Sequence, residues 1–245
     1  MFTNNTTLVL TGGGMRCAWS GGLLYGLNEC GIHPKCIVAA SGNVGNATYF
    51  CSGQYESGKR IWTEHLTGGR FISFLRPKRV IDIDYLIDDV LRTYETIHWE
   101  AVRSSKTQII CPIHAVYSDT VKIGSNQDIN YEFLRASMAL PVIYGKDVIL
   151  DGVAYRDFAF TPSELCDYAP QDSDIVVIDV RMQNRFVRLL GKPFMRPKPE
   201  KELSQEIRIV IPKIKSHILS RSKETLCSIF EDGRRFAHEN VSQLQ

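Results

Sequence analysis

Short runs of apolar residues alternate along the chain with segments in which apolar residues recur every three or four positions. Thr7–Thr11, Cys36–Ala40 and Ile175–Val180 are continuous β-branched and apolar runs, as is typical of strands buried on both faces of a parallel sheet. Between the first two runs, apolar residues at helical spacing predict a helix over Met15–Cys30. This alternation of strand and helix predicts an α/β fold.

The rest of the chain adds elements of both kinds. The same patterns predict helices over Val44–Phe50, Tyr55–Leu66 and Tyr131–Met138, and strands over Thr107–Ser118, Val121–Ile123, Val148–Leu150 and Ile207–Ile211. Asp82 or Asp84 is expected to cap a further helix, whose apolar face is Leu86, Ile87, Val90 and Leu91. We expect a single domain over residues 1–245, with its core within about 7–180 and a basic loop and C-terminal helices over 181–245.

Composition narrows the class of protein without identifying it. The chain has 245 residues, 44% of them hydrophobic, so it can bury a full core. Its seven cysteines are odd in number and never form a C-x-x-C pair, so we expect reduced thiols and a cytoplasmic location. No signal peptide, membrane span or metal-ligand cluster is evident. The net charge of +2 says little about partners, and we expect no nucleic-acid partner.

Ser41 stands at the sharpest predicted turn, between the run Cys36–Ala40 and the helix that starts near Val44. A serine raised at the end of a strand, beside the free N–H groups of the next helix, is typical of a nucleophile elbow. The usual pattern is G-x-S-x-G, whereas this chain has Ala39 and Asn43 at the glycine positions. Because asparagine tolerates positive φ, the turn remains feasible, and an ordinary strand–turn–helix is the alternative.

The first strand ends in Gly12, Gly13 and Gly14, followed by a helix. A glycine loop before a helix brings backbone N–H groups close to an anion. The Lys-Ser/Thr of a P-loop and the G-x-G-x-x-G of a dinucleotide site are both missing, which leaves an oxyanion loop or a plain glycine turn. Arg16 either neutralises a phosphate headgroup or satisfies loop carbonyls.

Asp151 follows the apolar run Val148–Leu150 and precedes Gly152. A carboxylate at the end of a strand can serve as a base at the rim of a sheet. Asp-Gly is also one of the commonest turn dipeptides, so a simple turn is an equal alternative.

In their order and spacing, these landmarks resemble the patatin-like phospholipases and acyl hydrolases. The resemblance covers roughly Thr7–Val180 and rests on Thr11-Gly-Gly-Gly-Met-Arg-Cys, Ala39-Ala-Ser-Gly-Asn, Ala136-Ser-Met-Ala-Leu-Pro and Asp151-Gly, with Arg70-Phe-Ile-Ser-Phe and Asp84-Tyr-Leu-Ile-Asp resembling the bacterial branch. It implies a three-layer α/β/α sandwich with a mainly parallel sheet, and a serine–aspartate dyad without histidine. Cys17 departs from the family, which has glycine after the arginine.

Carried over residue by residue, the resemblance implies Ser41 as nucleophile, Asp151 as base and Gly12–Gly14 as the oxyanion loop. Arg16 matches the family's basic residue, and the turn residues Gly42 and Asn43 complete the expected substrate-binding set. The implied function is hydrolysis of lipid acyl esters, with no cofactor.

Two other functions stay open. A Ser–Asp–His α/β-hydrolase would need His217, in an amphipathic and helical context, or His238 in a C-terminal helix. A lipid-binding protein with a weak or inactive elbow is the non-enzymatic alternative. We also expect Arg181–Lys201, which is rich in basic residues, to contact anionic membrane, or else to be a solvated surface loop. The sequence does not predict an oligomeric state.

Overall fold

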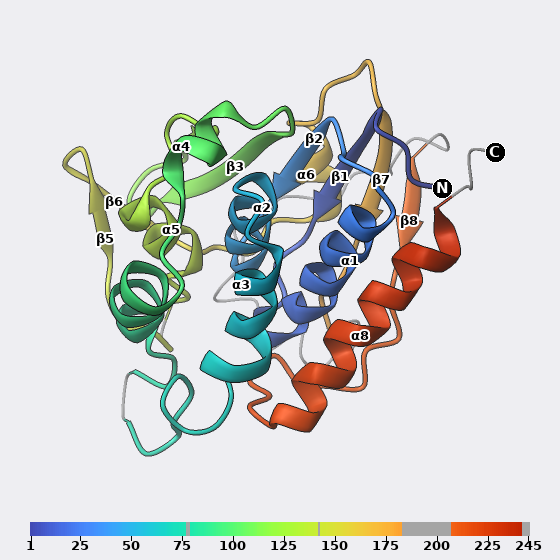
Figure 1. The fold of residues 1–245 in the computed structure, drawn as a ribbon. Coiled ribbons are helices and arrows are strands. Elements are labelled where there is room, and N and C mark those ends of the chain that lie inside the picture. Colours follow the sequence, from blue (N-terminus) through green and yellow to red (C-terminus); the bar gives the residue numbers. More distant parts are fainter. Residues whose placement is uncertain (77–78, 142, 183–206, 242–245) are drawn as a thin grey trace.

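A mixed β-sheet forms the centre of the computed structural model, which describes residues 1–76, 79–141, 143–182 and 207–241 (Figure 1). Its strands are β1 (Thr6–Leu10), β2 (Cys36–Ala39), β3 (Gln108–Ala115), β4 (Val121–Gly124), β5 (Val148–Leu150), β6 (Val153–Arg156), β7 (Asp174–Ile178) and β8 (Arg208–Val210). They run in the order β5-β6-β3-β2-β1-β7-β8, and β4 also pairs with β3. The pairs among β3, β2, β1, β7 and β8 are parallel, whereas β4, β5 and β6 form antiparallel pairs at one edge.

Helices cover both faces of this sheet. They are α1 (Ala18–Glu29), α2 (Gly42–Cys51), α3 (Tyr55–Arg60), α4 (Trp99–Ser104), α5 (Tyr131–Met138), α6 (Pro162–Cys166) and α8 (Lys223–Asn240), with a 3₁₀ turn η1 (Gly14–Cys17) and π-helical segments η2 (Ile61–His65) and η3 (Tyr85–Tyr94). The predicted helices over Met15–Cys30 and Tyr55–Leu66 are therefore each divided in two. The α/β fold class and its layers are confirmed.

The two faces of the sheet bury alternate residues of the same strands. Leu8, Leu10 and Ile37 join the larger core under α1, α2 and α8, while Val9 and Val38 join a smaller core under α6. This alternation follows from the two-residue period of a strand and explains why the runs are apolar throughout.

Helix α8 packs closely along α1, as Figure 1 shows. A Cβ placed on Gly22 would lie 1.8 Å from the carbonyl oxygen of Phe230, and one on Gly233 would lie 1.9 Å from that of Trp19. Only glycine fits at these two positions, so the C-terminal helix is part of the layer that covers the sheet.

Three parallel strands end at the same level. Leu10 pairs with both Ala39 and Ile178, so the residues that follow β1, β2 and β7 emerge together at one edge. These residues are the glycine loop, the turn at Ser41 and the segment that begins at Asp179. Since β2 and β7 lie on opposite sides of β1, this is the place where open α/β sheets commonly bind ligands.

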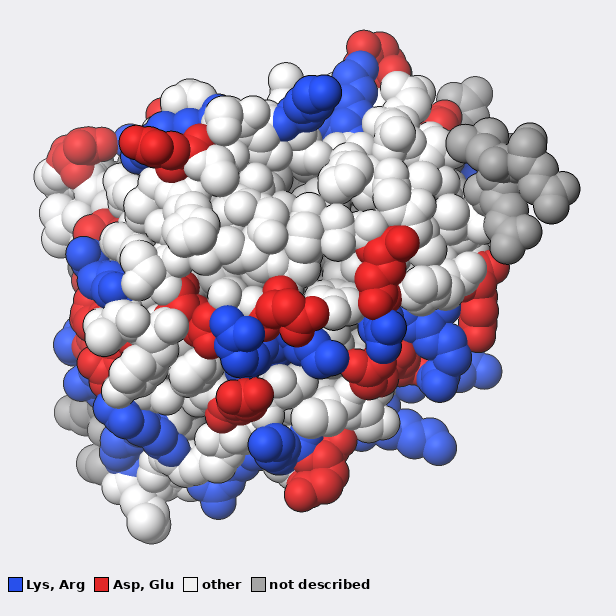
Figure 2. All heavy atoms as spheres, in the orientation of Figure 1, with Lys and Arg blue, Asp and Glu red and all other residues white. Residues whose placement is uncertain are grey.

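Charged side chains of both signs are concentrated on the lower half of the face shown in Figure 2, while its upper half is mostly uncharged. In the part of the chain that is described, no helix is long and apolar enough to cross a membrane. The predicted basic surface at Arg181–Lys201 falls almost entirely outside the described residues. The cytoplasmic location and the single domain remain predictions from the sequence.

Candidate active site

Ser41 occupies a strained turn between β2 and α2. Its φ and ψ are 58° and −139°, and its side chain is buried. Asn43 N donates to Ala40 O at 3.2 Å, and Val44 N donates to Ser41 O at 2.9 Å, so the helix begins directly after the serine. A non-glycine residue at positive φ costs about 1–3 kcal/mol and persists only where surrounding contacts enforce it. The strand–turn–helix predicted around Ser41 is present, and the strain falls on the serine itself.

Asp157 is the carboxylate that the structure brings to Ser41. It follows β6, is 6% exposed, and its backbone N–H donates to Ala139 O at 3.0 Å. Burial raises the pKa of Asp157 to about 7, and the nearby Ser41 hydroxyl acts in the opposite direction. Within the described ranges, Oδ2 of Asp157 is buried without a hydrogen-bond partner. A carboxyl with this pKa beside a serine hydroxyl is suited to accept and return a proton near neutral pH.

Two buried thiols lie close enough to Asp157 for its charge to raise their pKa values. Burial and then the charge of Asp157 raise the pKa of Cys17 to about 12, and the same two causes raise the pKa of Cys111. Asp157 therefore lies among η1, β3 and the turn at Ser41.

Asp151 is not at this site, and the prediction that it is the base is wrong in the structure. It lies in the two-residue turn between β5 and β6, its side chain is 84% exposed, and Lys122 Nζ is 2.8 Å from its Oδ2. Asp151 and Gly152 both have positive φ, 50° and 78°, as a tight hairpin turn of type I′ requires. The chain reverses there, so the strand that returns toward Ser41 is β6.

The glycine loop lies against the serine. A Cβ on Gly12 would be 3.0 Å from Ser41 Cβ, and Gly14 has a φ of +55°. Among the described residues, no backbone carbonyl accepts a hydrogen bond from the N–H groups of Gly12, Gly13 or Gly14. Gly42 opens α2, so its N–H likewise precedes the helical hydrogen-bond pattern. The amide of Gly13 lies near the Cys17 thiol, so the N–H groups of Gly12, Gly14 and Gly42 are the donors that face no backbone carbonyl or thiol of the residues that the structure describes.

Asn43 has a structural role that differs from the one expected of it. It is helical, its Nδ2 donates to Thr11 O at 2.8 Å, and its Oδ1 accepts from Asn46 Nδ2 at 2.8 Å. Asn46 also donates to Cys17 O, and Trp62 Nε1 donates to Asn46 Oδ1. This buried chain of amides ties the end of β1 to α2 and η2, and it fixes the peptide plane that leads into the glycine loop.

Arg16 satisfies loop carbonyls rather than facing a headgroup. It is 6% exposed; Nε donates to Val180 O at 2.6 Å, and Nη1 donates to Ile214 O and Ser216 O at 3.0 Å each. Burial lowers the pKa of its guanidinium. The carbonyl-binding alternative for Arg16 is therefore the one observed.

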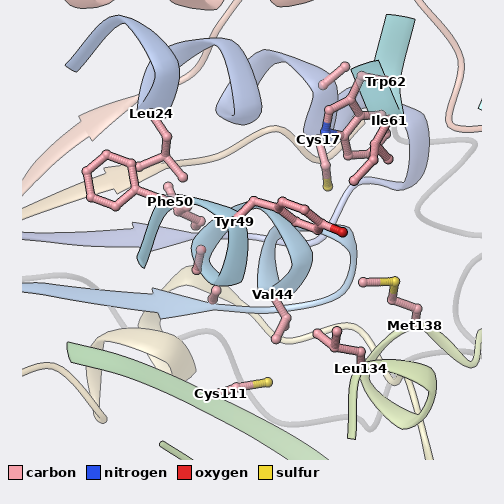
Figure 3. Packing of buried hydrophobic residues seen from close by; sticks show 14 of the residues in the cluster. Cys17, Leu24, Val44, Tyr49, Phe50, Ile61, Trp62, Cys111, Leu134 and Met138 are labelled. Atoms are coloured by element: carbon pink, nitrogen blue, oxygen red, sulfur yellow. The ribbon is translucent and has the colours of Figure 1, made fainter. Parts of the chain in front are cut away.

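Cys17 packs beside the turn at Ser41. Figure 3 shows its sulfur directed toward α2, with Trp62 close by. A Cβ on Gly42 would lie 3.5 Å from both Cys17 Cβ and the Trp62 ring. Trp62, Met138, Gly42 and Gly45 also line a mostly apolar cavity of about 30 Å³ along α2. Its lining includes Gly42, the residue after Ser41, and it has room for about two water-sized groups.

Neither candidate histidine is at the site. The ring of His238 on α8 lies 2.8 Å from Glu29 Oε2, at the surface between α1 and α8. His217 is exposed in a non-helical segment, contrary to the predicted helical context, and no side-chain hydrogen bond between it and Ser41 or Asp157 is found in the described chain. Nor do the described residues contain a group of three or more His, Cys, Asp or Glu residues that could hold a metal ion.

Comparison with known proteins agrees with the resemblance stated above. Residues 8–104 match the family model of patatin-like phospholipases. The fold is similar to that in a crystal structure of VipD from Legionella pneumophila, with a TM-score of 0.51 and 10% identity over 96% of this chain. The match spans 66% of the VipD chain, so this protein covers just under two thirds of that structure. A search of curated proteins gave no match.

Proposed function

We propose that the protein is a serine hydrolase of lipid acyl esters in which Ser41 is the nucleophile and Asp157 the general base. The observation that carries this proposal is the strained, buried Ser41 held against a buried carboxyl whose pKa is raised to about 7. A serine hydroxyl needs such a base, because it is a weak nucleophile at its own pKa.

The reaction follows from this pair. Asp157 accepts the proton of Ser41 as Oγ attacks the ester carbonyl, which forms a tetrahedral intermediate with a negative oxygen. Asp157 then gives the proton to the departing alcohol oxygen, leaving an acyl-serine. Water attacks this ester with Asp157 again accepting a proton, and Ser41 recovers its own as the fatty acid leaves.

The backbone N–H groups of Gly12, Gly13, Gly14 and Gly42 are the proposed oxyanion donors. Removing one such donor from a hydrolase costs roughly 3 kcal/mol of transition-state stabilisation, so their orientation matters for rate. Asn43 holds the Thr11 carbonyl and thereby the peptide that joins β1 to this loop. It acts as a positioning residue, not as a donor to the oxyanion.

Two observations support a lipid as substrate. The cavity along α2 is mostly apolar and is lined by Gly42, the residue after Ser41, so it would take the part of an acyl chain nearest the ester carbonyl. The family model that matches residues 8–104 is that of patatin-like phospholipases.

A catalytically weak lipid-binding protein is the second candidate. It is favoured by Cys17, which stands where the family has glycine. Burial and the charge of Asp157 raise the pKa of this thiol, while hydrogen bonds from the backbone amides of Gly13 and Asn43 act in the opposite direction. The sulfur therefore lies close to one of the proposed oxyanion donors, and its bulk would hinder a tetrahedral intermediate there.

Labelling with a fluorophosphonate probe separates the two candidates, because the probe needs an activated serine and working oxyanion donors. The wild-type protein is expected to be labelled, and Ser41→Ala is not. Ser20→Ala is the control, since Ser20 is also buried but lies on α1. Absence of labelling in the folded wild-type protein would contradict the proposed hydrolase.

A further inference from the structure

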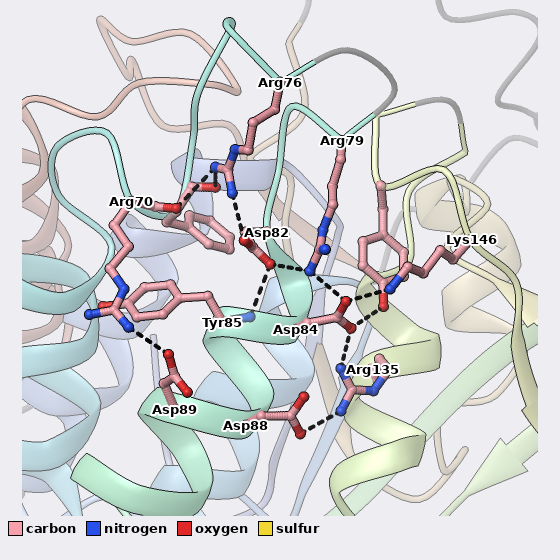
Figure 4. A network of polar contacts seen from close by, with 12 residues as sticks. Arg70, Arg76, Arg79, Asp82, Asp84, Tyr85, Asp88, Asp89, Arg135 and Lys146 are labelled. Carbon is pink, nitrogen blue, oxygen red and sulfur yellow. Dashed lines mark hydrogen bonds and ion pairs between the residues drawn. The ribbon is translucent and has the colours of Figure 1, made fainter.

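The loop between η2 and η3 presents two large apolar side chains to solvent. Phe74 is 61% exposed and Leu75 is 92% exposed. The loop is held from below by ion pairs, since Arg76 and Arg79 bind Asp82, and Arg79 also binds Asp84 (Figure 4). An anchored loop that exposes adjacent apolar side chains indicates a binding surface.

The sequence around this apolar tip is basic. Residues 211–223 contain Lys213, Lys215, Arg221 and Lys223 and no acidic residue. The arginines of the loop itself are paired, Arg70 with Asp89, and Arg76 and Arg79 with Asp82. Figure 2 shows basic and acidic side chains together in the lower part of the molecule, where Figure 1 places the loop and the start of α8. The basic character of residues 211–223 is that of a surface for an anionic partner.

The two segments are in contact. Gly68 N donates to Arg221 O at 2.8 Å, Arg221 Nη1 donates to Ile72 O at 3.3 Å, and the Arg221 guanidinium lies 5.7 Å from the centre of the Phe74 ring. They therefore form one docking surface, defined as residues 67–76, 79–81 and 211–223.

This docking surface reaches the glycine loop. Ile218 O accepts from Met15 N at 3.0 Å, directly after Gly14. Arg221 is three positions after Ile218, a span of roughly 10 Å at most. A partner bound at Phe74 and Leu75 would thus be connected through residues 218–221 to the glycine loop that lies against Ser41.

We propose that the docking surface binds anionic phospholipid membranes, with Phe74 and Leu75 entering the acyl region and the basic side chains of residues 211–223 contacting lipid phosphates. This combination of apolar insertion and cationic contacts is how peripheral proteins hold a charged bilayer. This inference rests on the proposed function, because a lipid hydrolase would need to reach a membrane. Membrane binding itself can be measured without any hydrolysis.

Binding is tested with Ser41→Ala protein and sucrose-loaded vesicles, made of phosphatidylcholine alone or with about a third of phosphatidylglycerol. The protein is expected to sediment with the anionic vesicles and much less with the neutral ones. In the Ser41→Ala protein, the substitutions Phe74→Ser and Leu75→Ser are each expected to weaken binding to anionic vesicles by about tenfold. The matched control is Ile149→Ser with Tyr117→Ser, because these side chains are 60% and 85% exposed outside the docking surface.

Three results would overturn the proposal: no sedimentation with anionic vesicles, equal binding to both vesicle types, or equal losses in the docking and control variants. A second assay, of hydrolysis, distinguishes failure of the docking surface from failure of the proposed function. With Ser41 intact, the Phe74 and Leu75 variant should hydrolyse a soluble p-nitrophenyl ester like wild type but hydrolyse vesicle lipid more slowly. If the wild type hydrolyses neither substrate, the proposed function fails, and the sedimentation result still decides the docking surface.

Discussion

Replacing Asp157 with asparagine should change how the stability of the protein depends on pH. Burial raises the pKa of Asp157 from 3.8 to about 7. Between these two values the folded protein holds a proton that the unfolded chain releases. The stability this proton provides is fully present below about pH 4 and is lost as pH rises through about 7. Above that pH, the folded protein must hold a buried carboxylate.

The magnitude follows from the shift. A pKa shift of about three units lowers the free energy of unfolding by roughly 4 kcal/mol as pH rises over the whole range. About 2.5 kcal/mol of this loss falls between about pH 5 and pH 8. Asparagine cannot ionise, so Asp157→Asn should gain about 2.5 kcal/mol relative to wild type across that interval. Comparing the two proteins cancels the groups that they share.

The assay is urea unfolding of wild type, Asp157→Asn and Asp151→Asn at several pH values. Asp151→Asn is the matched control because its carboxylate is exposed and paired with Lys122. Its unfolding free energy should follow that of wild type at every pH. Parallel profiles for wild type and Asp157→Asn would refute the buried, proton-binding carboxyl on which the proposed mechanism depends.

Three further predictions concern the residues around the pair. Asn43→Gly should lower both stability and turnover, because it leaves Thr11 O without its donor, at a cost of about 1–3 kcal/mol, and leaves Asn46 Nδ2 with Cys17 O alone. Thermal unfolding and kcat check this, and a faster enzyme would contradict it. Met138→Ala enlarges the cavity along α2 and should shift the preferred ester toward longer acyl chains, read from kcat/KM over a chain-length series. Arg16→Lys should lower the unfolding midpoint, since one ammonium cannot replace three carbonyl contacts, and an unchanged midpoint would argue against this role.

The sequence predicts the central sheet well because its strands are continuous apolar runs. The turn at Ser41 is also predictable, since Ser-Gly-Asn interrupts such a run immediately before a helical pattern. The mistaken assignment of Asp151 comes from giving the Asp-Gly pair a catalytic rather than a turn role. Taken as a type I′ hairpin signal, the pair predicts a second strand from Val153 and leads to Asp157 at its end. Helix α6 could also have been predicted, because Thr161-Pro-Ser-Glu164 is a capping box with proline at the first helical position.

Other features depend on contacts that residue types do not reveal. Residues 214–221 reach the glycine loop and the Phe74 loop largely through backbone atoms, as in Met15 N to Ile218 O and Gly68 N to Arg221 O. Backbone partners about 150–200 positions apart cannot be identified from residue type.

The most direct test of the proposed Ser41–Asp157 pair is kcat on a soluble p-nitrophenyl ester for wild type, Asp157→Asn and Asp151→Asn. Loss of a general base lowers the rate by about a hundredfold to ten-thousandfold, and we expect a loss in this range for Asp157→Asn. Asp151→Asn should turn over at the wild-type rate. A wild-type rate in Asp157→Asn, with the loss appearing in Asp151→Asn, would contradict the account.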